Sequence, residues 1–99
     1  MLLNPNRFSS LNIPADYLRD AIDSVATGAN LRQLRLLHNL TQEDLSEALG
    51  MIGIPYSVVS ISAAENGLHV PKTEVLQGLA TLYRCAVGDL LVTFGDDAA

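Results

Sequence analysis

The chain has 99 residues, 48% of them hydrophobic, which suits one compact domain. Its net charge is −5 with only 6 Lys and Arg residues, which excludes a broadly basic nucleic-acid-binding surface and leaves only a local patch for phosphate contacts. The single Cys85 excludes an internal disulfide and predicts a cytoplasmic protein, and no apolar run approaches the ~20 residues of a membrane span.

Residues 1–28 are expected to form an N-terminal arm followed by an extra helix. Residues 1–12 are polar and turn-rich, and Pro14 suits the first turn of a helix. Apolar side chains then recur at the three- and four-residue spacing of one helical face: Leu18, Ala21, Ile22 and Val25. The pair Thr27-Gly28 predicts the end of this helix, because glycine is favoured just beyond helix C-termini.

Residues 29–92 are expected to form the main domain, and its first two helices carry clear end signals. Asn30 predicts the cap of the first helix. Thr41 predicts the cap of the second, because its hydroxyl can accept from the backbone N–H of Asp44 while the Asp44 carboxylate reaches back. Gly50 predicts the end of that second helix.

The rest of the domain follows a loop at residues 51–56. Further helices are expected at three places: behind a Ser57 cap and up to Asn66-Gly67, after Pro71, and around Leu90 and Leu91. Residues 93–99 form a short tail. The sequence therefore predicts an all-α fold, a bundle of five core helices with one additional N-terminal helix.

Several short motifs follow one another in a fixed order: Leu31-Arg32-Gln33-Leu34-Arg35, Leu40-Thr41-Gln42-Glu43-Asp44-Leu45, Glu65-Asn66-Gly67, Pro71 and Val87-Gly88-Asp89-Leu90-Leu91. With them, residues 31–91 resemble the lambda-repressor-like, or xenobiotic-response-element (XRE) type, helix-turn-helix family, over about two-thirds of the chain. That family places its second helix across the DNA phosphates and its third in the major groove. The resemblance therefore implies a DNA-binding domain.

The resemblance also implies which residues contact DNA. Thr41 and Gln42, at the start of the second family helix, would approach a phosphate. The groove-facing positions of the recognition helix are Ser57, Val58, Val59, Ser60 and Ala63. The loop that usually follows the DNA backbone contains Leu68, His69 and Lys72. Arg35 and Glu65 match a partly buried ion pair with a structural role.

Two departures from the family pattern leave alternatives open. Val58, Val59 and Ala63 stand where polar, base-reading side chains are common, so they either contact thymine methyl groups or pack, with direct reading lost. The turn before the recognition helix is roughly five residues longer than the compact family turn. Its apolar residues 52–56 either cover the core or form a contact surface.

The leading hypothesis is a sequence-specific transcriptional regulator, repressor-like, that binds a near-palindromic operator in double-stranded DNA as a homodimer. Two apolar sets are candidates for the dimer surface: Leu18, Ile22 and Val25, or Val87, Leu90, Leu91 and Phe94. A second hypothesis is a protein-binding, antirepressor-like module whose patch is formed by Ile54, Tyr56, Val58 and Val59. A third is an antitoxin that holds a toxin through residues 1–28.

Neither an enzyme nor a cofactor-binding protein is expected. His38 and His69 lack Cys or carboxylate clusters at ligand spacing, so no metal site is predicted. The chain has no phosphate-cradling glycine-rich loop and no motif typical of a Ser-His-Asp or Cys-His pair.

Overall fold

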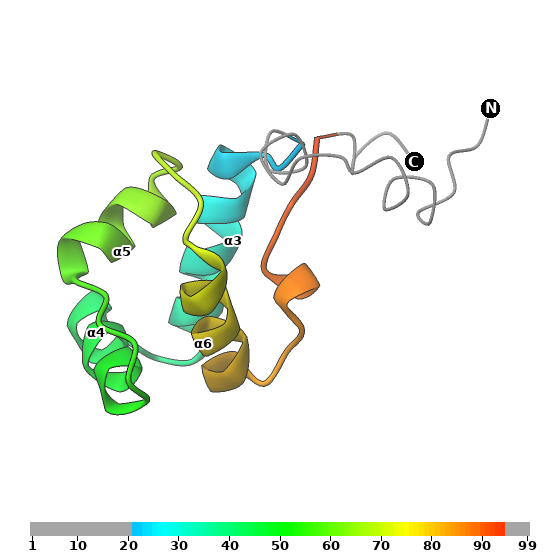
Figure 1. The fold of residues 1–99 in the computed structure, drawn as a ribbon. Helices are drawn as coiled ribbons and strands as arrows, with labels where there is room; N and C mark the ends of the chain where they lie inside the picture. The colour runs from blue at the N-terminus through cyan, green and yellow to red at the C-terminus, as the bar shows by residue number, and fades with distance from the viewer. Residues whose placement is uncertain (1–20, 95–99) are drawn as a thin grey trace.

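The computed structural model of the protein describes residues 21–94, so most of the predicted extra helix and the end of the tail lie outside the described residues. Within this range the regular secondary structure is helical, apart from an isolated antiparallel bridge between Ile22 and Thr93. Figure 1 shows the elements in order: α3 (Ser24–Leu37), α4 (Gln42–Met51), α5 (Val58–Glu65), α6 (Thr73–Tyr83) and the 3₁₀ turn η1 (Val87–Asp89). The predicted all-α class is confirmed for these residues.

The first described helix corrects the predicted helix boundaries. α3 begins at Ser24, where the Asp23 carboxylate caps it by accepting from the backbone N–H of Ala26 at 3.0 Å. It continues without a break to Leu37. The helix end predicted at Thr27-Gly28 and the cap predicted at Asn30 are therefore wrong, because all three residues lie inside one helix.

Gly28 is needed for helix packing and not for a helix end. It lies where α3 passes close to the end of α5. A Cβ at this position would come within 2.7 Å of the carbonyl oxygen of Glu65 and closer still to that of Ala64. Only glycine lets the two backbones approach this closely without displacement.

The polar side chains around Gly28 bind the C-terminal segment of the domain. The buried Thr27 hydroxyl accepts from the backbone N–H of Val92 at 2.9 Å. The Asn30 amide donates to the carbonyl oxygens of Asp89 and Leu90, at 2.9 and 3.1 Å. These residues resemble helix caps in the sequence, but their partners lie about 60 positions further along the chain.

The next two helices begin as predicted. Thr41 and Asp44 form the capping box of α4, each side chain accepting from the other residue's backbone N–H at 3.0 Å. Ser57 caps α5 by accepting from the N–H of Ser60 at 3.1 Å. α4 extends one residue past Gly50, to Met51.

The long turn between α4 and α5 folds back onto the core. Ile54 packs against α6 at Gly78, where its Cδ1 atom occupies the space that a Cβ would need. The Ser46 hydroxyl donates to the carbonyl oxygen of Tyr56 at 2.6 Å, which fixes the turn to α4. Ile54 and Tyr56 are both half-buried against the core cluster.

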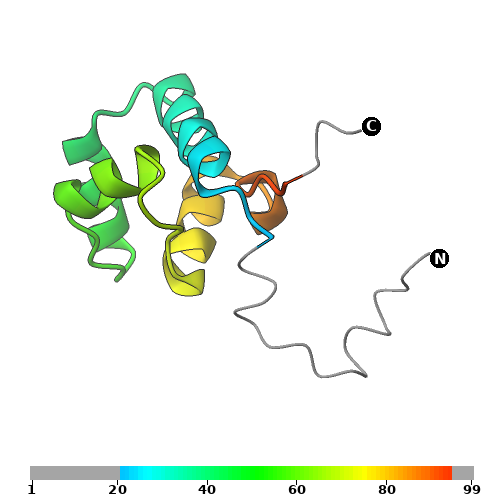
Figure 2. The ribbon, with the colours of Figure 1, turned by 90° about the horizontal axis from the view of Figure 1, so that it is seen from above.

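The core forms where the helices meet. The two views agree that α4 and α5 lie on one side of α3 and α6, with η1 on the other side (Figures 1 and 2). The buried apolar side chains are Leu31, Leu45, Leu49, Ile61, Ala64, Val75, Leu76, Leu79, Ala80, Tyr83 and Leu90. The helix expected to carry Leu90 and Leu91 is only the turn η1, which ends before both.

Candidate nucleic-acid interface

The inner side of α5 is fixed by a junction of Arg35, Glu65 and Gln42, here called the inner junction. The Arg35 guanidinium donates to both Glu65 carboxylate oxygens, from Nε at 2.7 Å and from Nη2 at 3.0 Å. Its third donor, Nη1, reaches the carbonyl oxygen of Leu40 at 2.8 Å. The Gln42 amide donates to Glu65 Oε1 at 3.2 Å. Three helices, α3, α4 and α5, therefore meet at one carboxylate.

The charges in the inner junction are shielded and mutually satisfied. The side chains of Arg35 and Glu65 are only 9% and 6% exposed. The hydrogen bonds to Glu65 raise the pKa of Arg35, so the guanidinium stays charged. Because the two charges compensate each other at this buried position, the pair holds α3 to the end of α5.

The opposite side of α5 is an open hollow, here called the outer groove. Its floor and rim are formed by seven residues: Gln42, Val58, Val59, Ser62, Ala63, Asn66 and Leu68. Val59 and Leu68 are 79% and 77% exposed, whereas Val58 and Ala63 are half-buried behind them. None of the seven is charged. The outer groove is therefore an uncharged surface with prominent apolar side chains.

The polar side chains on and beside the outer groove are largely engaged within the protein. The Ser57 hydroxyl, besides capping α5, donates to the Ser60 hydroxyl at 3.1 Å. The Asn66 amide donates to the Ser62 hydroxyl at 3.4 Å. Since the Gln42 amide is held by Glu65, the surface presents mainly carbon.

A second hollow lies between the end of the turn and the start of α6. His69 and Lys72 line it together with Ser60 of α5 and Glu74 of α6. The Tyr56 hydroxyl and His69 Nε2 are hydrogen-bonded at 3.1 Å. Both His69 and Lys72 are exposed. Lys72 therefore brings a positive charge to this hollow beside Ser60 of α5. The Glu74 carboxylate lines the same hollow and opposes that charge.

The predicted DNA-contact residues fall into three groups. Gln42, Val58, Val59 and Ala63 share the outer groove, whereas Ser60, His69 and Lys72 share the second hollow. Thr41 and Ser57 line neither hollow and cap α4 and α5. Thr41 lies at the start of α4, where its hydroxyl and backbone N–H are both bound to Asp44. Hydrogen bonding with Thr41 lowers the pKa of Asp44, which keeps this carboxylate charged. The carboxylate also occupies the Thr41 backbone N–H, which is therefore not free for a phosphate. Asn66, which lines the outer groove, was not among the predicted contacts.

The four-residue patch predicted for a protein partner is divided in the structure. Val59 is the exposed member, while Ile54, Tyr56 and Val58 are half-buried. Burial also raises the pKa of Tyr56. The turn thus contributes mainly to the core, and the exposed apolar surface near it lies on α5.

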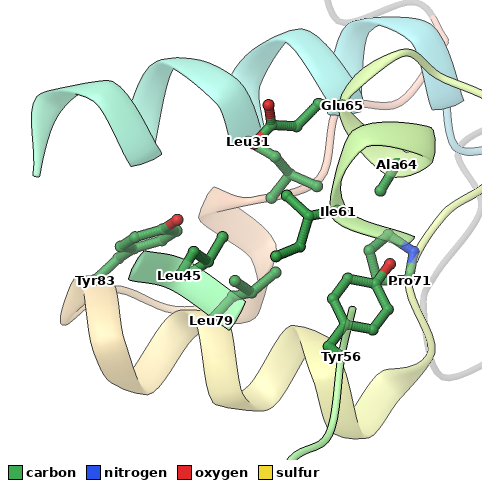
Figure 3. A pocket seen from close by; sticks show the side chains of 9 residues that line it. All are labelled: Leu31, Leu45, Tyr56, Ile61, Ala64, Glu65, Pro71, Leu79 and Tyr83. Carbon is green, nitrogen blue, oxygen red and sulfur yellow. The ribbon is translucent and has the colours of Figure 1, made fainter. Parts of the chain in front are cut away.

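A small cavity lies behind α5, between the inner junction and α6. Figure 3 shows Tyr83 at one end of it, Tyr56 and Pro71 at the other, and the Glu65 carboxylate above. Its volume of about 10 Å³ leaves no room for an organic effector. The Tyr83 hydroxyl is buried and has no hydrogen-bond partner among residues 21–94. Burial together with the Glu65 charge raises its pKa to about 12.

The described residues offer neither a metal site nor a membrane-spanning segment. In residues 21–94, no three His, Cys, Asp or Glu side chains gather to hold a metal ion. No helix in the same range has the length and hydropathy needed to cross a membrane.

Two capped helices, joined by a turn and with the second exposed along one side, define a helix-turn-helix domain. The chain belongs to the helix-turn-helix family, whose model matches residues 31–90, and within it to the lambda-repressor-like class of DNA-binding regulators. It is 33% identical to an uncharacterised helix-turn-helix-type transcriptional regulator of Methanocaldococcus jannaschii over 67 residues, covering 68% of this chain and 94% of the relative. No solved structure matches the chain.

Proposed function

We propose that this chain is a sequence-specific, repressor-like transcriptional regulator that places α5 in the major groove of double-stranded DNA. The observation that carries this proposal is the contrast between the two sides of α5. Ile61 and Ala64 are buried in the core, whereas Val59 on the other side is 79% exposed. A helix fixed along one side and open along the other can enter a groove without unfolding the domain.

The residues beside α5 suit contacts to the DNA phosphates, which position a protein on DNA without reading its sequence. Lys72 lines the second hollow with Ser60 of α5 and is exposed, so its charge is available to a phosphate. Thr41 and Gln42 stand at the start of α4, next to the outer groove. His69 stands beside Lys72. Lys72 and His69 would orient the domain on the backbone as they stand, whereas Thr41 and Gln42 would exchange a bond to Asp44 or Glu65 for one to a phosphate. Ser57, Val58, Val59, Ser60 and Ala63 would face the bases.

We further propose that the protein binds a near-palindromic operator as a homodimer. Val25 and Phe94 are 68% and 67% exposed. The backbone N–H of Phe94 donates to the carbonyl oxygen of Ala21 at 3.0 Å, which places Phe94 near the start of α3. Leu90, by contrast, is fully buried and is not available to a partner. The end of the domain around Val25 and Phe94 is therefore the favoured dimer surface.

The test is selection from a randomised duplex library by the purified protein at low and at physiological salt, followed by sequencing. We expect enrichment of a two-fold symmetric site, with half-sites about one helical turn apart. Lys72→Ala should weaken binding to all sequences, whereas Ser60→Ala should change the enriched bases. The exposed substitution Arg32→Ala, on α3, serves as the control and should bind as the parent does. Absence of any enriched sequence at low salt would overturn the proposal.

A further inference from the structure

The outer groove differs chemically from a surface that reads bases through hydrogen bonds. Direct reading of purines rests on donors and acceptors such as those of Arg, Lys, Asn and Gln. No residue lining the outer groove is charged. Its two amide side chains, Gln42 and Asn66, are directed to Glu65 and Ser62 within the protein. The groove therefore offers base edges no charged group, and its polar side chains are two amides, each with one hydrogen bond directed inward, and the Ser62 hydroxyl.

The outer groove also presents exposed hydrocarbon. Val59 projects from the first turn of α5 and is 79% exposed, and Leu68 flanks the groove with 77% of its surface exposed. Val58 and Ala63 lie half-buried between them. Contact between such a cluster and another apolar group is favourable, because it removes apolar surface from water. Contact with a purely polar base edge contributes little.

On the major-groove edges of the four DNA bases, thymine alone carries an apolar group, the C5-methyl. We propose that the outer groove reads the C5-methyl groups of thymines, with Val59 as the principal contact and Leu68 and Ala63 beside it. This inference rests on the proposed function, and it adds the chemical feature of DNA that α5 recognises. The operator is then defined by the positions of its thymines more than by guanine contacts.

The test replaces thymine by uracil in the selected duplex, one position at a time. Uracil pairs as thymine does and keeps every hydrogen-bonding group, so only the methyl is lost. We expect each contacted thymine to contribute about three- to fivefold in Kd, the value for burying one methyl group. Uracil at positions outside the half-sites should have no effect.

Variants of the protein identify the side chain responsible. Val59→Ala should reduce the thymine-to-uracil ratio of affinities toward one at a single position in each half-site. Lys72→Ala, a phosphate contact under the proposed function, should weaken both duplexes equally and leave the ratio unchanged. Because Val59 is exposed, its replacement should leave the melting temperature unchanged.

The outcomes separate the inference from the proposed function. Specific binding with equal affinity for thymine and uracil duplexes would overturn methyl reading and leave the regulator standing. A ratio that survives in Val59→Ala would overturn the role of Val59. Absence of specific binding by the parent protein would overturn both.

Discussion

The two sides of α5 differ in their chemistry and in their role. The inner junction is ionic, buried and saturated with hydrogen bonds, with Arg35 making three of them. The outer groove is uncharged, open and largely apolar, with Val59 at its most exposed point. The helix is held in place by one set of residues and presents another set to a target, with Gln42 alone of the named residues belonging to both. Substitutions should therefore affect either stability or binding, according to the side on which they fall.

The largest expected effect is the loss of the ion pair in the inner junction. Arg35→Ala leaves the Glu65 carboxylate, 6% exposed, without its compensating charge. We expect the free energy of unfolding to fall by about 3 kcal/mol. Urea denaturation measures it, and Arg32→Ala on the exposed side of the same helix is the control. Equal stability of the two variants would mean that the junction does not hold α5.

The next largest effect is expected where α3 and α5 touch. Gly28→Ala places a Cβ against the carbonyl oxygens of Ala64 and Glu65, so the helices must separate. We expect a loss of about 2 kcal/mol, although alanine favours helix more than glycine does. Gly50→Ala in α4 is the matched control, because nothing lies within 4 Å of the added Cβ. The stability of Gly50→Ala should equal or exceed that of the parent protein. A similar loss of stability in both variants would contradict the close approach of α3 to α5.

A smaller effect of opposite sign is expected at Tyr83, which has the unpartnered hydroxyl on the inner side. Tyr83→Phe removes a buried group that makes no hydrogen bond, so we expect a gain of about 1 kcal/mol at neutral pH. The control Tyr56→Phe removes a hydroxyl bonded to His69 and should not gain. Destabilisation by Tyr83→Phe would show that the hydroxyl is satisfied in solution.

The same residue makes stability depend on alkaline pH. Folding raises the pKa of Tyr83 from 10.0 to about 12, so the folded protein holds this proton more tightly than the unfolded chain. The resulting stabilisation is complete below pH 10 and is lost as the pH rises toward 12. Denaturation at several pH values should show a decline that is reduced in Tyr83→Phe. Part of it remains, because burial also raises the pKa of Tyr56. Parallel pH profiles of parent and variant would contradict this origin.

The smallest effect on stability is expected on the outer groove. Val59→Ala removes two methyl groups that are mostly in water already, so the free energy of unfolding should change by less than about 0.5 kcal/mol. Ile61→Ala, two residues along the same helix and 2% exposed, should instead lose at least about 2 kcal/mol. Comparable losses in both variants would mean that the outer side of α5 is also part of the core.

Features set by neighbouring residues were predictable from the sequence. The caps at Thr41 and Ser57 depend on partners three positions away, so a local pattern suffices. The true roles of Gly28 and Asn30 were not predictable, because their partners lie in α5 and near η1 and no local signal separates a packing glycine from a terminal one. The bond from Gln42 to Glu65, 23 residues away, also needs the fold. The resemblance indicated which side of α5 stays open, but the contacts that hold the other side emerged only from the structure.

The most direct test of the account is amide chemical-shift mapping of the labelled protein as the selected duplex is added. The account predicts that shifts concentrate at residues 57–63, at the start of α4 and around His69 and Lys72. The exposed apolar residues Leu37 and Met51, away from the outer groove, should stay unchanged. Shifts centred on Leu37 and Met51, with residues 57–63 unaffected, would contradict the assignment of α5 as the DNA-contacting helix.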